Sequence, residues 1–282
     1  MMQCKSGLVW VFMVLVFCLK AQNVVQESRP ITIGESLRMD SKIMAESRQI
    51  NIYLPAEFKK EEAKNYGVVY LLDGGLDEDF IHTSGLVQYV NFPWIQQLPP
   101  GIVVGIGNTD RKRDMTFPTR VMNEKNKFPT SGGSARFIDF LEKEVIALVK
   151  ERYQISGPSY LIGQSLAGLL ATEVVMTRPS LFDNYIIVSP SVWWDNGSIL
   201  KREALQLGQL RANIYLAVGK EGLAPSEEPH VMEVDVNLLA EKLKDKLPSE
   251  ARFYFDYLPA ENHATIGHQA VYNAIRWLAS KP

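Results

Sequence analysis

The stretch YLIGQSLAGLL, residues 160–170, is an apolar run followed by a serine between small residues and then by a helical pattern. A nucleophile elbow has this order, because its serine sits on a strained turn between a buried strand and a helix. The positions two before and two after the serine must be small, and Gly163 and Ala167 occupy them. The stretch therefore predicts Ser165 as a nucleophile, with an ordinary helix N-cap serine as the alternative.

Short apolar runs elsewhere in the chain predict the other strands of a sheet. Gly, Asp or Ser-Pro follows each of these runs, which lie at residues 68–72, 102–106, 160–162, 186–188 and 214–218. Strands that are apolar on both faces belong to parallel sheets covered by helices. Apolar residues at helical spacing, as in residues 135–153 and 232–247, predict those helices. The alternation predicts a single-domain α/β fold, with a mostly parallel central sheet and helices on both faces.

Two segments depart from this alternation. Residues 49–54 alternate between apolar and polar side chains, which predicts a strand with one face in water. Residues 107–133 show no clear period and carry many charges. A loop of this length within a compact domain is usually functional or disordered, so a lid and a plain solvated insertion both stay open.

The N-terminus carries the pattern of a secretory signal. Lys5 precedes a short apolar run, and Ala21 offers a small residue for cleavage. We expect a signal peptide at residues 1–21, a folded domain at residues 22–282, and a periplasmic or secreted protein without stable membrane insertion after cleavage. An uncleaved N-terminal anchor and a lipoprotein modified at Cys18 are the alternatives.

The composition excludes several classes of function. The chain of 282 residues is 46% hydrophobic and 22% charged, which is ordinary for a globular protein. A formal net charge of −2 gives no reason to expect nucleic acid as a partner. The two cysteines, Cys4 and Cys18, both lie in the predicted signal, so the mature chain would have no thiol chemistry. The sequence contains neither a zinc-protease helix motif nor a dinucleotide fingerprint, so we predict no metal and no cofactor.

A serine hydroxyl needs a base to remove its proton, and the chain has four histidines. His263 follows an alternating strand pattern at residues 252–258 and precedes the last predicted helix. Because an α/β fold with a serine nucleophile carries its base after the final strand, His263 is the predicted general base. We expect structural or solvent-facing roles for His82, His230 and His268.

The third member of a triad is an acid that orients the imidazole and lies between the serine and the histidine in chain order. Glu221 comes just after the strand predicted at residues 214–218 and is the first candidate. Asp195, Glu227 and Glu228 stay open as alternatives.

Acyl transfer also needs N–H donors aimed at the developing oxyanion. The backbone N–H of Leu166, the residue after the nucleophile, should be one of them. The second is expected from Gly74 or Gly75, because paired glycines let the backbone turn toward the site without a Cβ; a plain Gly-Gly turn is the alternative. Trp193 and Trp194 follow a strand end and are expected to wall a substrate pocket, with core packing as the alternative.

Four stretches together resemble the esterase D-like family of the α/β-hydrolase superfamily. They are GQSLAG at residues 163–168, NTDRKRD at residues 108–114, SPSVWW at residues 189–194 and ENH at residues 261–263. The resemblance covers about residues 30–280. Within the family, the chain is similar to the branch that cleaves enterobactin or bacillibactin trilactones.

The resemblance implies a serine carboxylic-ester hydrolase of the α/β-hydrolase fold that acts on a small-molecule ester without a metal. It implies Ser165 as the nucleophile, His263 as the base, and Arg111, Asp114 and the tryptophan pair around the pocket mouth. The acid varies within the family, and some siderophore esterases resemble a Ser–His dyad. A ferric-siderophore trilactone esterase is the narrower interpretation, and a non-catalytic binding protein on the same fold is the interpretation from another class.

Overall fold

The computed structural model describes residues 27–99, 101–203 and 207–280. The chain divides into two units, residues 1–32 and residues 33–282. The described part of the first unit contains neither helix nor strand. The predicted signal peptide lies outside the described residues. All elements given below belong to the second unit.

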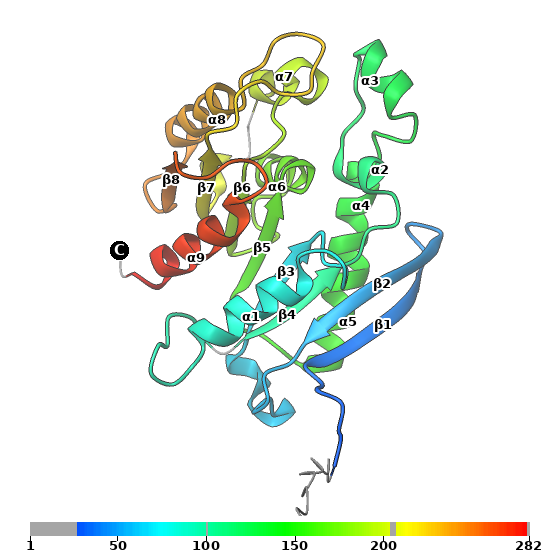
Figure 1. Ribbon diagram of the computed structural model, residues 1–282, viewed down its shortest axis with the longest axis vertical. Helices are drawn as coiled ribbons and strands as arrows, with labels where there is room; N and C mark the ends of the chain where they lie inside the picture. The colour runs from blue at the N-terminus through cyan, green and yellow to red at the C-terminus, as the bar shows by residue number, and fades with distance from the viewer. Residues whose placement is uncertain (1–26, 100, 204–206, 281–282) are drawn as a thin grey trace, which may run out of the picture. The chain divides into compact units, whose positions relative to one another are not determined.

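A single eight-stranded sheet forms the centre of the second unit (Figure 1), in the order β1-β2-β4-β3-β5-β6-β7-β8. The strands are β1 (Gly34–Ser41), β2 (Glu46–Tyr53), β3 (Gly67–Leu72), β4 (Gly101–Ile106), β5 (Ser159–Gln164), β6 (Asn184–Val188), β7 (Asn213–Gly219) and β8 (Phe253–Leu258). Strand β2 pairs antiparallel with β1 and β4, and every other pair is parallel. The mostly parallel sheet is confirmed, whereas strand β1 was not predicted.

Helices cover both faces of this sheet. They are α1 (Phe80–Val90), α2 (Arg111–Met115), α3 (Met122–Lys127), α4 (Ser134–Phe140), α5 (Ile146–Tyr153), α6 (Leu166–Thr177), α7 (Trp194–Lys201), α8 (Met232–Lys246) and α9 (Ile266–Ala279), with 3-10 turns η1 (Lys60–Asn65) and η3 (Leu207–Gln209) and a π-helical turn η2 (Leu141–Val145). Helices α1 and α9 lie on the near face in Figure 1 and pack over Val69, Val103 and Ile162. Helices α4, α5, α6 and α8 pack on the opposite side chains, among them Tyr70, Val104 and Leu161.

The burial of the strands follows from this covering on both faces. Every residue of β3, β4 and β6 is buried, as expected for parallel strands between two helical layers. The prediction of one wet face for residues 49–54 is wrong at Asn51, which is fully buried. Its side-chain amide donates to the Gly74 carbonyl oxygen at 2.8 Å, so a buried polar residue supports the loop after β3.

The segment without a period, residues 107–133, forms α2 and α3 joined by turns. A buried ion pair fixes it to the sheet, because Asp114 Oδ2 lies 2.7 Å from Arg48 Nη1 and both side chains are inaccessible to solvent. Every helix in the part of the chain that the structure describes is too short or too polar to cross a membrane.

Candidate active site

Ser165 joins the end of β5 to the start of α6. Its backbone has a φ of 61° and a ψ of −121°, a conformation that is costly for a residue with a side chain. A Cβ on Gly163 would lie 2.4 Å from the Ala167 carbonyl oxygen, so this turn requires glycine at position 163. Ala167 stands two positions after the serine, where glycine is usual, and the structure accommodates its methyl group fully buried. The structure therefore contains the elbow that the sequence predicts.

Three side chains from three different strand ends meet at this elbow. His263 Nε2 lies 3.0 Å from Ser165 Oγ, and His263 Nδ1 lies 2.6 Å from Glu221 Oε2. Because β5, β7 and β8 run parallel in one sheet, the residues that follow them meet at the same edge. The structure brings together the serine, imidazole and carboxylate in the order that proton transfer along a triad requires.

The Glu221 carboxylate is held in a fixed, nearly inaccessible position. Only 2% of its side chain is exposed, and its Oε1 accepts hydrogen bonds from Ser189 Oγ and from the Gly219 N–H. Burial by itself raises the pKa of Glu221, but the hydrogen bonds with His263 and Ser189 outweigh it, so its pKa is lowered. The ionised carboxylate can therefore stabilise a proton on the imidazole.

A second carboxylate supports the loop that carries Glu221. The two Glu233 oxygens accept from the backbone N–H groups of Glu221 and Gly222, at 2.9 and 2.8 Å. Sequence reasoning missed both Glu233 and Ser189. Ser189 opens the SPSVWW stretch, whereas nothing local distinguishes Glu233 from other acidic residues at the start of a helix.

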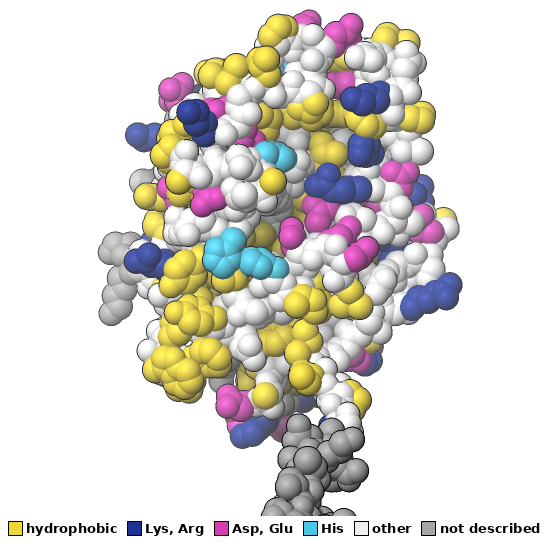
Figure 2. Space-filling model, in the orientation of Figure 1, with side chains coloured by type: hydrophobic (Ala, Val, Ile, Leu, Met, Phe, Trp, Pro, Cys, Tyr) yellow, Lys and Arg dark blue, Asp and Glu magenta, His cyan; other side chains and the backbone are white. Residues whose placement is uncertain are grey.

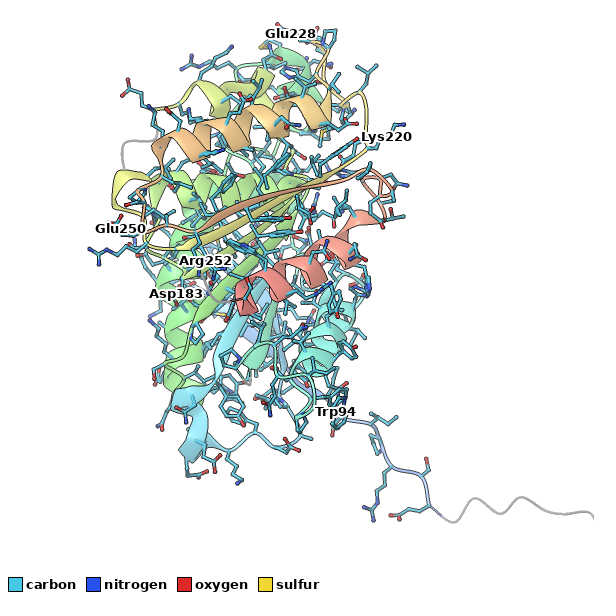
Figure 3. All side chains as sticks on the ribbon, turned by 90° about the vertical axis from the view of Figure 1, so that its left-hand side faces the viewer. Trp94, Asp183, Lys220, Glu228, Glu250 and Arg252 are labelled. Carbon is cyan, nitrogen blue, oxygen red and sulfur yellow. The ribbon has the colours of Figure 1, made fainter. Side chains whose placement is uncertain are left out.

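The other acidic candidates lie elsewhere. Asp195 Oδ1 accepts from the Arg120 N–H at 2.6 Å and from Thr119 Oγ1 at 3.1 Å. Glu228 lies on the loop between β7 and α8, away from Lys220 (Figure 3). Glu227 is its exposed neighbour in the chain. The contact with His263 therefore singles out Glu221.

The predicted oxyanion donors have different surroundings. Leu166 is the first residue of α6, and the first N–H groups of a helix lack partners within the helix. The prediction for Gly74 is wrong, because its N–H donates to the Ile106 carbonyl oxygen at 2.9 Å and extends the pairing of β3 with β4. The Gly75 N–H donates to Glu78 Oε2 at 2.7 Å, so a carboxylate oxygen occupies this donor.

A polar network that the sequence did not predict holds this loop. Asp73 has a φ of 53°, and its carboxylate accepts two hydrogen bonds from Arg111, at 2.7 and 2.8 Å. Asn108 bridges the network, because its side-chain amide donates to Asp73 and to Glu78 Oε1, both at 2.6 Å. Arg111 thus lies beside the site as expected, but its guanidinium is paired within the protein. A further unpredicted neighbour is Ser191, whose Oγ lies 3.3 Å from Ser165 Oγ.

Three residues expected around the pocket mouth belong to the interior. Asp114 is completely buried in its ion pair with Arg48. Trp194 is 1% exposed, and its Nε1–H donates to the Phe117 carbonyl oxygen. Trp193 is 7% exposed and packs edge to face against Trp194 in the same core cluster. The prediction that these three side chains line a pocket is wrong, because their partners lie within the framework.

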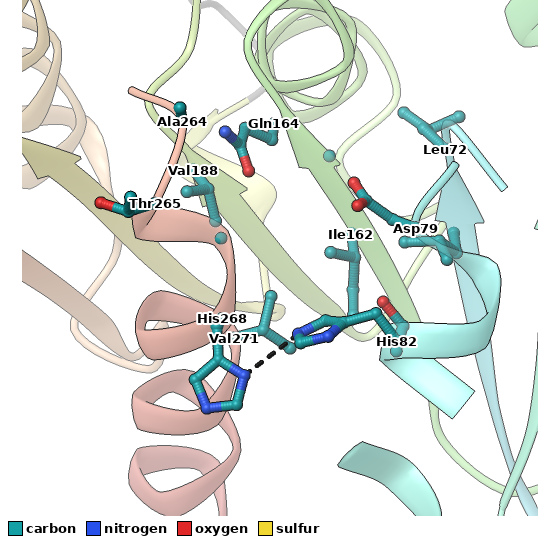
Figure 4. Close-up of a pocket in the computed structure, with 14 residues that line it drawn as sticks. Leu72, Asp79, His82, Ile162, Gln164, Val188, Ala264, Thr265, His268 and Val271 are labelled. Atoms are coloured by element: carbon teal, nitrogen blue, oxygen red, sulfur yellow. Dashed lines mark hydrogen bonds between the residues drawn. The ribbon is translucent and has the colours of Figure 1, made fainter. Parts of the chain in front are cut away.

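A cavity of about 250 Å³ adjoins the site between α1 and α9 (Figure 4). Gln164 lines it and also connects the elbow to the loop of His263, since its side-chain amide donates to the His263 carbonyl oxygen at 2.7 Å. Within residues 27–99, 101–203 and 207–280, no group of three or more histidine, cysteine or acidic side chains has the geometry to hold a metal ion.

A serine, an imidazole and a carboxylate in series at the carboxyl edge of this sheet define a serine hydrolase of the α/β-hydrolase fold. The chain belongs to the family described as "Putative esterase", whose model matches residues 41–257. That range contains Ser165 and Glu221 and ends before His263.

The chain is similar to two proteins whose names state an activity and to one further solved structure. The chain is 27% identical over 268 residues to the ferri-bacillibactin esterase BesA of Bacillus subtilis, covering 86% of this chain and 89% of the relative. An IroE-like serine hydrolase from Shewanella oneidensis is 30% identical, with a TM-score of 0.77 over 86% of this chain and 79% of that structure. The BES protein from Bacillus cereus is 26% identical, with a TM-score of 0.77 over 92% of this chain and all of that structure. The protein is a serine ester hydrolase.

Proposed function

We propose that Ser165, His263 and Glu221 are the catalytic triad of this ester hydrolase. The observation that carries the proposal is the pair of contacts in series, 3.0 Å from serine to imidazole and 2.6 Å from imidazole to carboxylate. These lengths are within the reach that proton transfer needs.

The reaction follows from the geometry of these groups. His263 Nε2 takes the proton of Ser165 as Oγ attacks the ester carbonyl carbon, and Glu221 stabilises the imidazolium. The Leu166 and Gly75 N–H groups stabilise the oxyanion, the latter after Glu78 has moved away. The imidazolium then gives its proton to the departing alkoxide. Water, deprotonated by His263, attacks the acyl-enzyme, releases the acid and restores Ser165.

Replacing Ser165 by alanine tests this mechanism. Turnover of p-nitrophenyl acetate and labelling by a fluorophosphonate should both vanish while the circular dichroism spectrum is retained. Ser280→Ala, at the exposed end of α9, is the matched control and should keep both. Undiminished turnover in pure Ser165→Ala protein would refute the mechanism, and a parent protein that neither turns over nor labels would support a non-catalytic binding protein.

We further propose a siderophore trilactone as the substrate. The support is the similarity to BesA, whose name specifies ferri-bacillibactin, over most of both chains. Incubation with ferric enterobactin or ferric bacillibactin should give linear fragments, detected by chromatography and mass spectrometry. If only short acyl or feruloyl esters are cleaved, the substrate proposal fails and the ester-hydrolase mechanism is unaffected.

We propose an extracytoplasmic location and partners limited to small molecules. The apolar run after Lys5 supports export, and the formal net charge of −2 supports the absence of a nucleic-acid partner. N-terminal sequencing of protein recovered outside the cytoplasm should begin after Ala21. An intact N-terminus on that protein would contradict cleavage.

A further inference from the structure

Two histidines from opposite ends of the chain meet at the mouth of the cavity between α1 and α9. His82 Nε2, on α1, lies 3.1 Å from His268 Nδ1, on α9, with the ring centroids 5.0 Å apart (Figure 4). Both residues are exposed, and Figure 2 shows two adjacent imidazoles on the face that it draws. The catalytic mechanism does not use either ring.

The other two imidazoles of the chain are already engaged with acids. His263 contacts Glu221 and Ser165 through its two ring nitrogens, and His230 Nδ1 lies 2.8 Å from Asp235 Oδ2. Both cysteines of the sequence lie outside the described residues. Imidazole is the preferred protein ligand for divalent copper, zinc and nickel. The remaining two histidines, on α1 and α9, lie next to each other. A nearby charged group is the Asp79 carboxylate, which lines the same cavity and interacts electrostatically with His82.

The separation of the two nitrogens suits a shared metal ion. A zinc ion binds imidazole nitrogens at about 2.0–2.1 Å, so two such ligands are about 2.9 Å apart at a right angle and about 3.4 Å apart at the tetrahedral angle. The observed 3.1 Å lies between these limits, so the separation of the two nitrogens is compatible with a shared ion.

We propose that His82 Nε2 and His268 Nδ1 form a binding site for a divalent transition-metal ion, with water in the remaining positions. Since no third protein ligand has suitable geometry among the described residues, the site should be weaker than a structural zinc centre and should favour Cu²⁺ over Zn²⁺ and Ni²⁺. Both nitrogens must be unprotonated, so acid should displace the ion.

A metal at this place would link the two loops that flank the nucleophile. Helix α1 begins directly after the loop of Gly75 and Glu78, and α9 begins at Ile266, three positions after His263. Helices held together by one ion can no longer move independently at these ends. We expect the bound ion to raise the melting temperature and to lower ester turnover; the second effect rests on the proposed function, whereas metal binding itself does not.

Titration of the chelator-treated mature protein with CuCl₂ at about pH 7.5 tests the site. Calorimetry should give one ion per chain, and electron paramagnetic resonance should show two nitrogen ligands. His82→Ala and His268→Ala should each weaken binding about tenfold or more. Ser165→Ala and His263→Ala should bind as the parent does, which separates this site from failure of the catalytic proposal.

His230→Gln is the matched control, because it removes an imidazole elsewhere on the chain and should leave binding unchanged. Circular dichroism of each variant establishes that it is folded. The proposal is overturned if the parent shows no saturable binding up to about 1 mM Cu²⁺. It is also overturned if the folded His82→Ala/His268→Ala double variant binds copper as tightly as the parent, since the histidine pair would then be only a hydrogen-bonded contact.

Discussion

Glutamine at position 221 would keep the shape of the glutamate while removing its charge and making one end of the side chain a donor. The Glu221 Oε1 accepts from the Gly219 N–H at 3.3 Å, and Oε2 contacts His263 Nδ1 at 2.6 Å. A backbone N–H can only donate, so the glutamine carbonyl should face Gly219 and its amide should face His263. The imidazole would then accept at Nδ1 and carry its proton on Nε2, which lies 3.0 Å from Ser165 Oγ.

A proton on Nε2 deprives Ser165 of its base, and a neutral glutamine no longer stabilises the imidazolium. The same change of tautomer in the serine-protease triad lowers kcat by about 10⁴. We therefore expect Glu221→Gln to lower kcat for p-nitrophenyl acetate by about 10³ to 10⁴, or about 4 to 5.5 kcal/mol of transition-state stabilisation. The KM should change little, because the carboxylate is buried behind His263 and is not expected to contact the substrate.

Steady-state kinetics with Glu228→Gln as the control would measure the effect. Glu228 is an exposed acid on the neighbouring loop, so its substitution should leave kcat within about twofold. Thermal unfolding of each variant would separate lost chemistry from lost structure. A folded Glu221→Gln enzyme that retains more than about a tenth of the parent kcat would refute the role of the acid and favour a Ser–His dyad.

Glu78→Ala should raise kcat/KM for small esters about fivefold to tenfold, since it frees the Gly75 N–H from a charged hydrogen bond; a decrease would show that the carboxylate is needed to hold the loop. Asp114→Ala should lower the free energy of unfolding by about 3 kcal/mol in urea titrations, because it removes the fully buried partner of Arg48 and leaves Glu46, 2.8 Å away, as the remaining carboxylate; a loss below about 1 kcal/mol would contradict this. A hydrogen bond from Arg113 holds the pKa of the Glu46 carboxylate below its ordinary 4.5. The ionised carboxylate therefore contributes its full stabilisation to the fold above that pH, and this contribution is lost as the pH falls below it. The melting temperature of the parent should therefore fall more steeply below pH 4.5 than that of Glu46→Gln, and parallel curves would contradict a stabilising ion pair between Glu46 and Arg113, whose Nη2 lies 2.5 Å from Glu46 Oε1.

The catalytic edge could be predicted from the sequence because each of its residues follows a locally recognisable strand. Ser165, Glu221 and His263 come directly after apolar or alternating runs, and parallel strands place their carboxyl ends at one edge. This inference needs the order of strand, loop and helix but no knowledge of individual contacts. The backbone strain at Ser165 could be inferred for the same reason, since the small residues around it are visible in the sequence.

The surroundings of the triad could not be predicted, because they depend on contacts between segments that are far apart in the chain. Asn108 reaches Asp73 across 35 positions, and His268 reaches His82 across 186. Even Glu78, three residues after Gly75, shows no local sign that its carboxylate turns back onto that N–H. Polar side chains have this freedom because a hydrogen bond needs only one suitable partner within reach, whereas apolar burial imposes a period along the chain.

A distinctive sequence motif indicates that its residues cannot be freely exchanged. It does not indicate whether they contact the substrate or hold the surrounding structure in place. Arg111, Asp114 and Trp194 all lie in such stretches, and each has a specific partner in the structure: the Asp73 carboxylate, the Arg48 guanidinium and the Phe117 carbonyl oxygen. Removing any of these side chains takes at least one hydrogen bond from a partner group that is wholly or partly shielded from water, which costs free energy whatever the substrate. Arg111 shows why the two kinds of constraint overlap, because the loop that it fixes through Asp73 is the one that carries the proposed oxyanion donor, the Gly75 N–H. A side chain can thus be essential to this site without touching the ester.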